Sequence, residues 1–233
     1  MLKYGKYRAI RNIAIGWLSH AIHSTDFSER VFRIVIEILL MILCFNFFRF
    51  NGMINFNIMS SAVFTFLICH TVMWMLDGNF WVYMLDSFGW IRNSGIKSII
   101  SYVRLCRRLF QSADLCNAIL IFGSMCRGEF HERSDLDLRI IRRNDSWLGF
   151  LCLPAALFLR IVSFFILLPV DLQVADSYKF INHQMRKDEF PIVVYLRNGF
   201  ELKVAGKNFN EIEKDPSSIF LKKRQCDTIA NSE

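Results

Sequence analysis

Apolar residues are concentrated early in the 233-residue chain, in two runs that a short polar loop separates. The runs are Ile34–Phe48 and Ile58–Leu76, and the loop is Arg49–Asn57. The second run has about the 20 residues that a helix needs to cross a bilayer, whereas Glu37 interrupts the first. The pattern predicts a helical hairpin. We favour insertion in a membrane over burial in a soluble oligomer, because two adjacent apolar helices are costly to hide in so short a chain.

The charges beside the hairpin predict its orientation. Basic residues flank membrane helices mainly on the cytoplasmic side, and four of them precede the first run: Lys3, Lys6, Arg8 and Arg11. A hairpin returns the chain to the side on which it started, so everything after Leu76 is expected in the cytoplasm. Four aromatic residues are then expected at the membrane interface: Trp74, Trp81, Tyr83 and Trp90.

From Gly95 the pattern changes to that of a globular domain. Apolar residues at helical spacing predict one amphipathic helix: Ile99, Ile100, Val103, Cys106 and Phe110. Short apolar or alternating runs predict four strands: Ala118–Phe122, Asp135–Ile141, Val170–Val174 and Ile192–Leu196. We therefore expect three regions, namely a membrane-associated helical region in 1–94, a globular domain in 95–206 and a polar tail in 207–233.

Composition narrows the classes of partner. Hydrophobic residues make up 53% of the chain, which is high for a soluble enzyme. The net charge of +7 suits nucleotide phosphates, nucleic acid and an anionic membrane surface equally. Seven scattered cysteines without a C-x-x-C pair indicate reduced thiols in a cytosol-facing protein, not a zinc or redox motif.

Two short motifs carry the candidate chemistry. Gly123-Ser124 follows a predicted strand, where backbone N–H groups and a hydroxyl can hold phosphate oxygens. Asp135 and Asp137 are two positions apart, so on a strand both carboxylates project from the same face and can share divalent cations. Each motif is common alone, but together they predict a phosphate site beside a metal site.

The run GSMCRGE from Gly123 to Glu129, followed by SDLDL from Ser134 to Leu138, resembles the signature of the minimal nucleotidyltransferases of the DNA polymerase β superfamily. The resemblance covers roughly 95–205 and leaves the apolar N-terminal part unmatched. It implies an α+β fold, with a small mixed sheet flanked by helices, preceded here by the transmembrane hairpin. It also implies that the Gly-Ser turn holds the triphosphate of an NTP and that Asp135 and Asp137 bind two divalent cations, Mg²⁺ or Mn²⁺.

The same resemblance implies a third carboxylate on a later strand. Asp171, in the run Val170–Val174, fits this position better than Asp176, which falls at the end of that strand. Asp171 would help to hold the metal and accept a proton from the attacking hydroxyl. Arg127 is a candidate phosphate contact, although a solvated arginine is an equal alternative, and Ser134 is expected to cap the local backbone.

Two features depart from the family pattern. Arg139 brings a charge into a strand that is normally more apolar. The segment Trp147–Leu168 is almost continuously apolar, with Pro154 near its start and few polar residues, and its hydropathy would let it span a bilayer. We predict that it does not cross, because crossing would place Asp137 and Asp171 on opposite sides of the membrane.

The sequence therefore predicts a metal-dependent nucleotidyltransferase at the cytoplasmic membrane, with its catalytic domain facing the cytoplasm. It would transfer a nucleoside monophosphate from an NTP to a hydroxyl or phosphate acceptor and release pyrophosphate. The acceptor stays open among a lipid-linked or glycan precursor, a small molecule and a protein. Nucleic acid is not expected, because no aromatic platform accompanies the basic residues. The alternatives are a non-catalytic, membrane-anchored NTP-binding or interaction protein and a protein-AMPylating component of a toxin–antitoxin type system.

Overall fold

The computed structural model describes residues 10–11, 13–18, 25–52, 57–76, 80–82, 95–186, 189–202 and 206–220. Its centre is a four-stranded sheet in the order β3-β2-β1-β4. The strands are β1 (Cys116–Phe122), β2 (Leu136–Arg142), β3 (Val170–Ala175) and β4 (Ile192–Leu196). β1 pairs with β2 and β4 in antiparallel fashion, whereas β2 and β3 are parallel. The expected α+β class, with a small mixed sheet and flanking helices, is confirmed.

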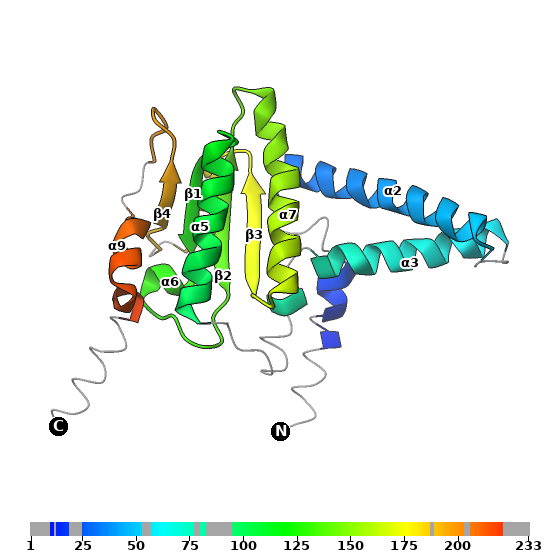
Figure 1. Cartoon of the computed structure of the whole chain (residues 1–233), viewed down its shortest axis with the longest axis horizontal. Coiled ribbons are helices and arrows are strands. Elements are labelled where there is room, and N and C mark those ends of the chain that lie inside the picture. Colours follow the sequence, from blue (N-terminus) through cyan, green and yellow to red (C-terminus); the bar gives the residue numbers. More distant parts are fainter. Residues whose placement is uncertain are drawn as a thin grey trace, which may run out of the picture.

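Helices cover the two faces of the sheet unequally. On one face lie α5 (Ile96–Ser112), α7 (Cys152–Phe165) and α9 (Phe209–Lys214), which enclose the main hydrophobic core (Figure 1). On the other face α8 (Tyr178–Gln184) closes a smaller core around Leu120, Ile141 and Ile181. Because α8 is short, part of this second face is left open to polar residues.

Strict alternation along β2 and β3 decides which residues reach the open face. Leu136 and Leu138 of β2 belong to the main core. Asp137 lies between them and Arg139 follows Leu138, so the side chains of Asp137 and Arg139 point to the other face of the sheet. β3 repeats the pattern, because its residues Val170, Leu172 and Val174 also belong to the main core. Asp171 therefore lies on the same face of the sheet as Asp137.

Three helical segments are long and apolar enough to cross a membrane: α2 (Phe27–Phe50), α3 (Ile58–Leu76) and Trp147–Phe165. The third comprises the 3-10 turn η1 (Trp147–Leu151) and α7. α7 connects the parallel neighbours β2 and β3 and packs on the sheet through buried Ala156 and Leu159. Pro154 stands in the first turn of α7, where its missing N–H costs no helical hydrogen bond. The structure thus has α7 as a crossover helix with an apolar outer side, which includes exposed Phe158 and Phe165.

The hairpin of α2 and α3 projects sideways from the sheet, beyond β3 and α7 (Figure 1). Most of its outward side chains are large, apolar and exposed, as a lipid-facing surface requires. Between the two helices Glu37 and His70 form a buried pair, with 2.6 Å between Oε1 and Nδ1. His70 also contacts the carbonyl oxygen of Trp17 through Nε2 at 2.7 Å. Glu37 of α2 and His70 of α3 are therefore paired across the hairpin.

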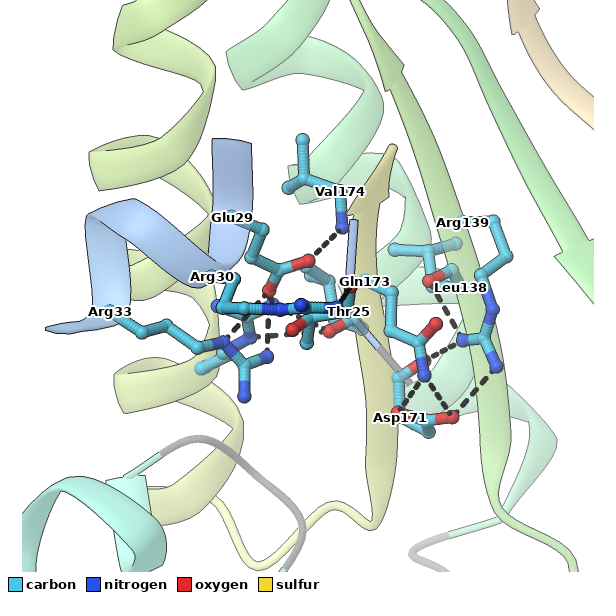
Figure 2. A network of polar contacts seen from close by, with 11 residues as sticks. Thr25, Glu29, Arg30, Arg33, Leu138, Arg139, Asp171, Gln173 and Val174 are labelled. Carbon is cyan, nitrogen blue, oxygen red and sulfur yellow. Dashed lines mark hydrogen bonds and ion pairs between the residues drawn. The ribbon is translucent and has the colours of Figure 1, made fainter. Parts of the chain in front are cut away.

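The start of α2 is fixed to the free edge of β3. The Glu29 carboxylate accepts the Val174 N–H at 2.7 Å and a hydrogen bond from Arg33 at 2.7 Å (Figure 2). Arg160 of α7 donates to the carbonyl oxygen of Leu172 at 2.7 Å and also contacts Glu29. The side chains of Glu29 and Arg160 are almost completely buried. A buried ionic cluster thus takes the place of a fifth strand along this edge.

A second set of contacts fixes the other end of the same edge. Asp176 donates its N–H to the Asp26 carboxylate at 2.8 Å, and its own carboxylate accepts the Ser28 N–H at 3.3 Å and pairs with Arg142. Arg142 also donates to the Ser28 hydroxyl at 2.9 Å. Asp176 thereby holds the hairpin to the sheet.

Residues 207–220, expected in a polar tail, contribute α9 and the 3-10 turn η2 (Pro216–Phe220) to the domain. Phe209, Ile212 and Ile219 are buried in the main core. Some residues used for the orientation prediction lie outside the described part of the chain, as do the last residues of the tail: Lys3, Lys6, Arg8, Tyr83, Trp90 and 221–233.

The position of α7 on the sheet predicts that residues before and after it face the same side of a membrane. We expect single cysteines at Ser146 and Ser177, which flank α7 and β3, to react with an impermeant maleimide from the same side of sealed vesicles. A cysteine at Asn51, in the exposed turn between α2 and α3, is expected to react only from the opposite side. Labelling is measured above that of the unchanged protein. Reaction of positions 146 and 177 from opposite sides would contradict this arrangement.

The buried cluster at the β3 edge predicts a large stability effect. Glu29→Gln leaves Arg33 and Arg160 buried without their carboxylate, so we expect a loss of about 3–5 kcal/mol in the free energy of unfolding. Faster amide exchange in β3 is expected with it. The matched control is Glu213→Gln, which removes the partner of half-exposed Arg104 and should cost no more than about 1 kcal/mol. Equal effects of the two substitutions would show that the cluster does not hold the edge.

Candidate functional site

The ends of three strands meet at one place on the open face. Phe122 at the end of β1 lies opposite Asp137 of β2, and Asp137 lies opposite Asp171 of β3. Gly123 follows Phe122 directly, so the Gly-Ser turn stands beside both carboxylates. The fold therefore brings together residues that are widely separated along the chain.

The turn after β1 is built closely against Asp137. Gly123 has a φ of 72°, which residues with a side chain rarely adopt, and a Cβ there would lie 1.9 Å from Asp137 Oδ2. The one-turn helix α6 (Ser124–Arg127) follows and ends at Gly128 in the left-handed conformation. The Ser124 hydroxyl is buried and has no hydrogen-bond partner among the described residues. Such a group is costly unless a ligand or water completes it.

A cavity of about 390 Å³ opens over this turn. Gly123, Ser124, Arg127, Asp135 and Asp137 all line it, so five of the six expected site residues share one cavity. Its volume lies in the range of roughly 300–1,000 Å³ that is typical of small-molecule sites. Both signs of charge surround it, as a site for an anionic ligand and a cation would require.

The carboxyl group of Asp137 has a raised pKa. Burial and the neighbouring charge of Asp135 raise the pKa of Asp137 to about 7, although Arg139 opposes the shift. The charges of Asp171 and Glu189 raise this pKa further. Burial and the neighbouring negative charges therefore keep Asp137 partly protonated near neutral pH when no cation is bound.

Asp171 lies beside Asp137 but does not line the cavity. Its carboxylate Oδ2 accepts a hydrogen bond from Arg139 Nη2 at 2.7 Å, and the same nitrogen is 3.5 Å from Asp137 Oδ1. Gln173 Nε2 is 3.3 Å from Asp171 Oδ2 and 3.4 Å from Oδ1 (Figure 2). In the described part of the chain, no group of three His, Cys, Asp or Glu side chains is gathered to hold a metal ion. The donors that fit a cation are thus Asp135 and Asp137, while the expected third ligand is engaged by a guanidinium.

Arg127 lines the cavity but is already paired. It bonds Glu129 at 3.0 Å and contacts Glu189, which is nearly buried. Its charge is balanced locally, so a phosphate would have to compete with two carboxylates for this side chain. Its assignment to nucleotide binding stays a prediction.

Ser134 caps a short loop before β2. Its hydroxyl accepts the His131 N–H at 3.0 Å and contacts His131 Nδ1 at 3.1 Å, while its own N–H donates to the His131 carbonyl. The cap fixes the backbone immediately before Asp135. It agrees with the local structural role expected for Ser134.

Several cavity residues were missed by the reading of the sequence. Arg139 could have been identified from the sequence, because it stands two positions after Asp137 and the alternation of a strand places both side chains on one face. Glu189 and Arg186 come from the segment after α8, and nothing in the local sequence ties them to β2. Arg133 lies in the loop between the two motifs and also lines the cavity. Along with Arg127 and Arg139, the cavity thus has four arginines around its acids.

Comparison of the chain with family profiles, with curated proteins and with solved structures found no match.

The raised pKa of Asp137 predicts a stability gain on its removal. The unfolded carboxyl ionises near pH 3.9 and the folded one near pH 7, so the wild type loses stability as pH rises through this window. Asp137→Asn lacks that loss. At pH 8 and without divalent cations, we expect the free energy of unfolding of the variant to exceed that of the wild type by up to about 4 kcal/mol. Near pH 4 this difference should vanish.

Thermal unfolding followed by tryptophan fluorescence measures this difference. The control is Asp145→Asn, because hydrogen bonds from Arg143 and Arg197 lower the pKa of exposed Asp145. That substitution should lower stability at pH 8, the opposite direction. An Asp137→Asn variant that is less stable than the wild type at pH 8 would refute the crowding of the carboxylates.

Proposed function

We propose that the protein is a membrane-associated, metal-dependent nucleotidyltransferase. It transfers a nucleoside monophosphate from an NTP to a hydroxyl or phosphate acceptor and releases pyrophosphate. The observation that carries the proposal is the packing of the Gly123-Ser124 turn against Asp137, in one cavity with Asp135. The resemblance to the minimal nucleotidyltransferases implies that a phosphate site and a metal site lie side by side, and this packing supports that expectation.

The residues of the turn suit the triphosphate. A side chain at position 123 would collide with Asp137, so glycine keeps the space between the backbone and the carboxylate. The buried hydroxyl of Ser124 needs a partner, which a phosphate oxygen can supply. Arg133 and Arg186 line the cavity with exposed side chains and add positive charge for an anion.

The acids suit a divalent cation, Mg²⁺ or Mn²⁺. Asp135 and Asp137 line the same cavity, and the pKa of Asp137 is raised by burial and by nearby negative charge, which a cation would offset. A cation held by Asp135 and Asp137 would neutralise the triphosphate and stabilise the leaving pyrophosphate. The chain's own residues position the nucleotide while an acceptor oxygen attacks the α-phosphorus. The bond from that phosphorus to the bridging oxygen of the β-phosphate breaks as the new bond forms, pyrophosphate leaves with that oxygen, and the proton of a hydroxyl acceptor passes to water.

The hairpin of α2 and α3 supports a location at the cytoplasmic membrane. Both helices are long and apolar enough to cross it, and the basic N-terminus favours a cytoplasmic location for the sheet domain. The start of α2 is bonded to the edge of β3, the strand next to that of Asp137. The proposal therefore includes acceptors that are presented at a membrane, such as lipid-linked precursors.

One observation favours a competing function. Arg139 and Arg127 are each paired with carboxylates, which would also suit a domain that binds an NTP without transferring it. The same cavity would then serve a membrane-anchored binding or interaction protein. Transfer and binding are distinguished by their products.

The test uses the full chain in lipid nanodiscs. It is incubated with each α-³²P-labelled NTP, Mg²⁺ or Mn²⁺, and an extract of membranes and cytosol. We expect label on an acceptor and free pyrophosphate with the wild type. The double variant Asp135→Asn, Asp137→Asn should lose this transfer by at least about 100-fold, because both candidate metal ligands are gone.

The control is Asp145→Asn, which removes an exposed carboxylate away from the cavity and should keep transfer near the wild-type rate. If the wild type and the double variant bind NTP equally well and neither transfers label, nucleotidyl transfer is excluded. Label on protein, lipid or a small soluble product then identifies the acceptor class.

A further inference from the structure

Arg139 is held in the centre of the site by four contacts. Nη2 donates to Asp171 Oδ2 at 2.7 Å and lies 3.5 Å from Asp137 Oδ1. Nη1 donates to the carbonyl oxygen of Asp171 at 2.7 Å and to that of Leu138 at 3.3 Å. Only 13% of its side chain is exposed. The guanidinium is therefore a fixed part of the sheet and not a mobile surface charge.

This arrangement leaves Asp171 few ways to bind a cation. Arg139 and Gln173 both donate to its Oδ2, and Gln173 is also within reach of its Oδ1. Asp171 is absent from the cavity lining, while Asp135 and Asp137 are present. A cation that approached from the cavity would thus meet two carboxylates and then the guanidinium.

The charges of the cluster agree with one cation. Three carboxylates (Asp135, Asp137 and Asp171) and one guanidinium leave two negative charges, which a single divalent cation balances. A second divalent cation between Asp137 and Asp171 would lie beside a guanidinium only a few ångströms away. Arginine keeps its proton at any ordinary pH, so this repulsion is permanent.

We infer that the Arg139 guanidinium occupies the place of a second cation, so that the site takes one divalent cation at Asp135 and Asp137. Asp171 then serves as the counter-ion that positions Arg139, and not as a metal ligand. The inference rests on the proposed function and specifies its cofactor. The inference is drawn from contacts of Arg139 within β2 and β3. A site with two cations, as the resemblance implies, has no place for these contacts.

Counting Mn²⁺ sites tests the inference without any measurement of activity. The full chain in nanodiscs is titrated with Mn²⁺ alone, and the free ion is followed by electron paramagnetic resonance. We expect one site per wild-type chain. Arg139→Leu frees Asp171 and should bind two ions per chain, whereas the control Arg197→Leu, which removes an ion-paired arginine outside the cavity, should keep one.

Two carboxylate variants make the test independent of how Arg139→Leu folds. Asp171→Asn retains an oxygen that can accept the hydrogen bond from Arg139. We therefore expect Mn²⁺ affinity to change by less than about tenfold, the smallest loss usually seen when a residue that supports a metal ligand is removed. Asp137→Asn should weaken Mn²⁺ by more than about 100-fold. Two sites in the wild type, or equal losses in both carboxylate variants, would overturn the inference and leave the proposed transfer standing. Absence of any Mn²⁺ site in the wild type would overturn both.

Discussion

The unpaired edge of β3 is the constraint on which the architecture depends. A parallel strand at the edge of a sheet exposes N–H and carbonyl groups that must find partners. Here Glu29 takes the N–H of Val174 and Arg160 takes the carbonyl of Leu172, so one residue from α2 and one from α7 substitute for a neighbouring strand. Because both side chains are buried, their charges must also satisfy each other. The same cluster thereby fixes the hairpin, the crossover helix and the strand of Asp171 relative to one another.

Local patterns were sufficient to predict the four strands and five of the residues that line the cavity. The strands β1 to β4 lie where short apolar or alternating runs were found, because burial on one face demands a period of two. The Gly-Ser turn and the two aspartates follow from the same local rules. In each case the physical cause acts over a few residues, so the sequence carries the information directly.

Other features depend on distant partners, and local patterns alone did not predict them. That Trp147–Leu168 does not cross a membrane was predicted only from the need to keep Asp137 and Asp171 on one side. Trp147–Phe165 has the hydropathy of a spanning segment, since a helix with one side on a sheet and an apolar outer side has the same composition. Within this segment, the polar residues Arg160 and Ser163 were the indication that one side of the helix faces the sheet domain, because both are buried there. The pairing of Arg127 with Glu189 had no comparable sign. Long-range ion pairs depend on the fold and leave no periodic pattern.

The coverage of the β3 edge by α2 also bears on the order of synthesis. The hairpin leaves the ribosome before any strand of the sheet, so Glu29 is already present when β3 is made. A nascent domain without it would offer Val174 and Leu172 to the strands of other chains, the usual route to aggregation. The residues of α2 that cover the β3 edge are thus available as soon as that strand is made.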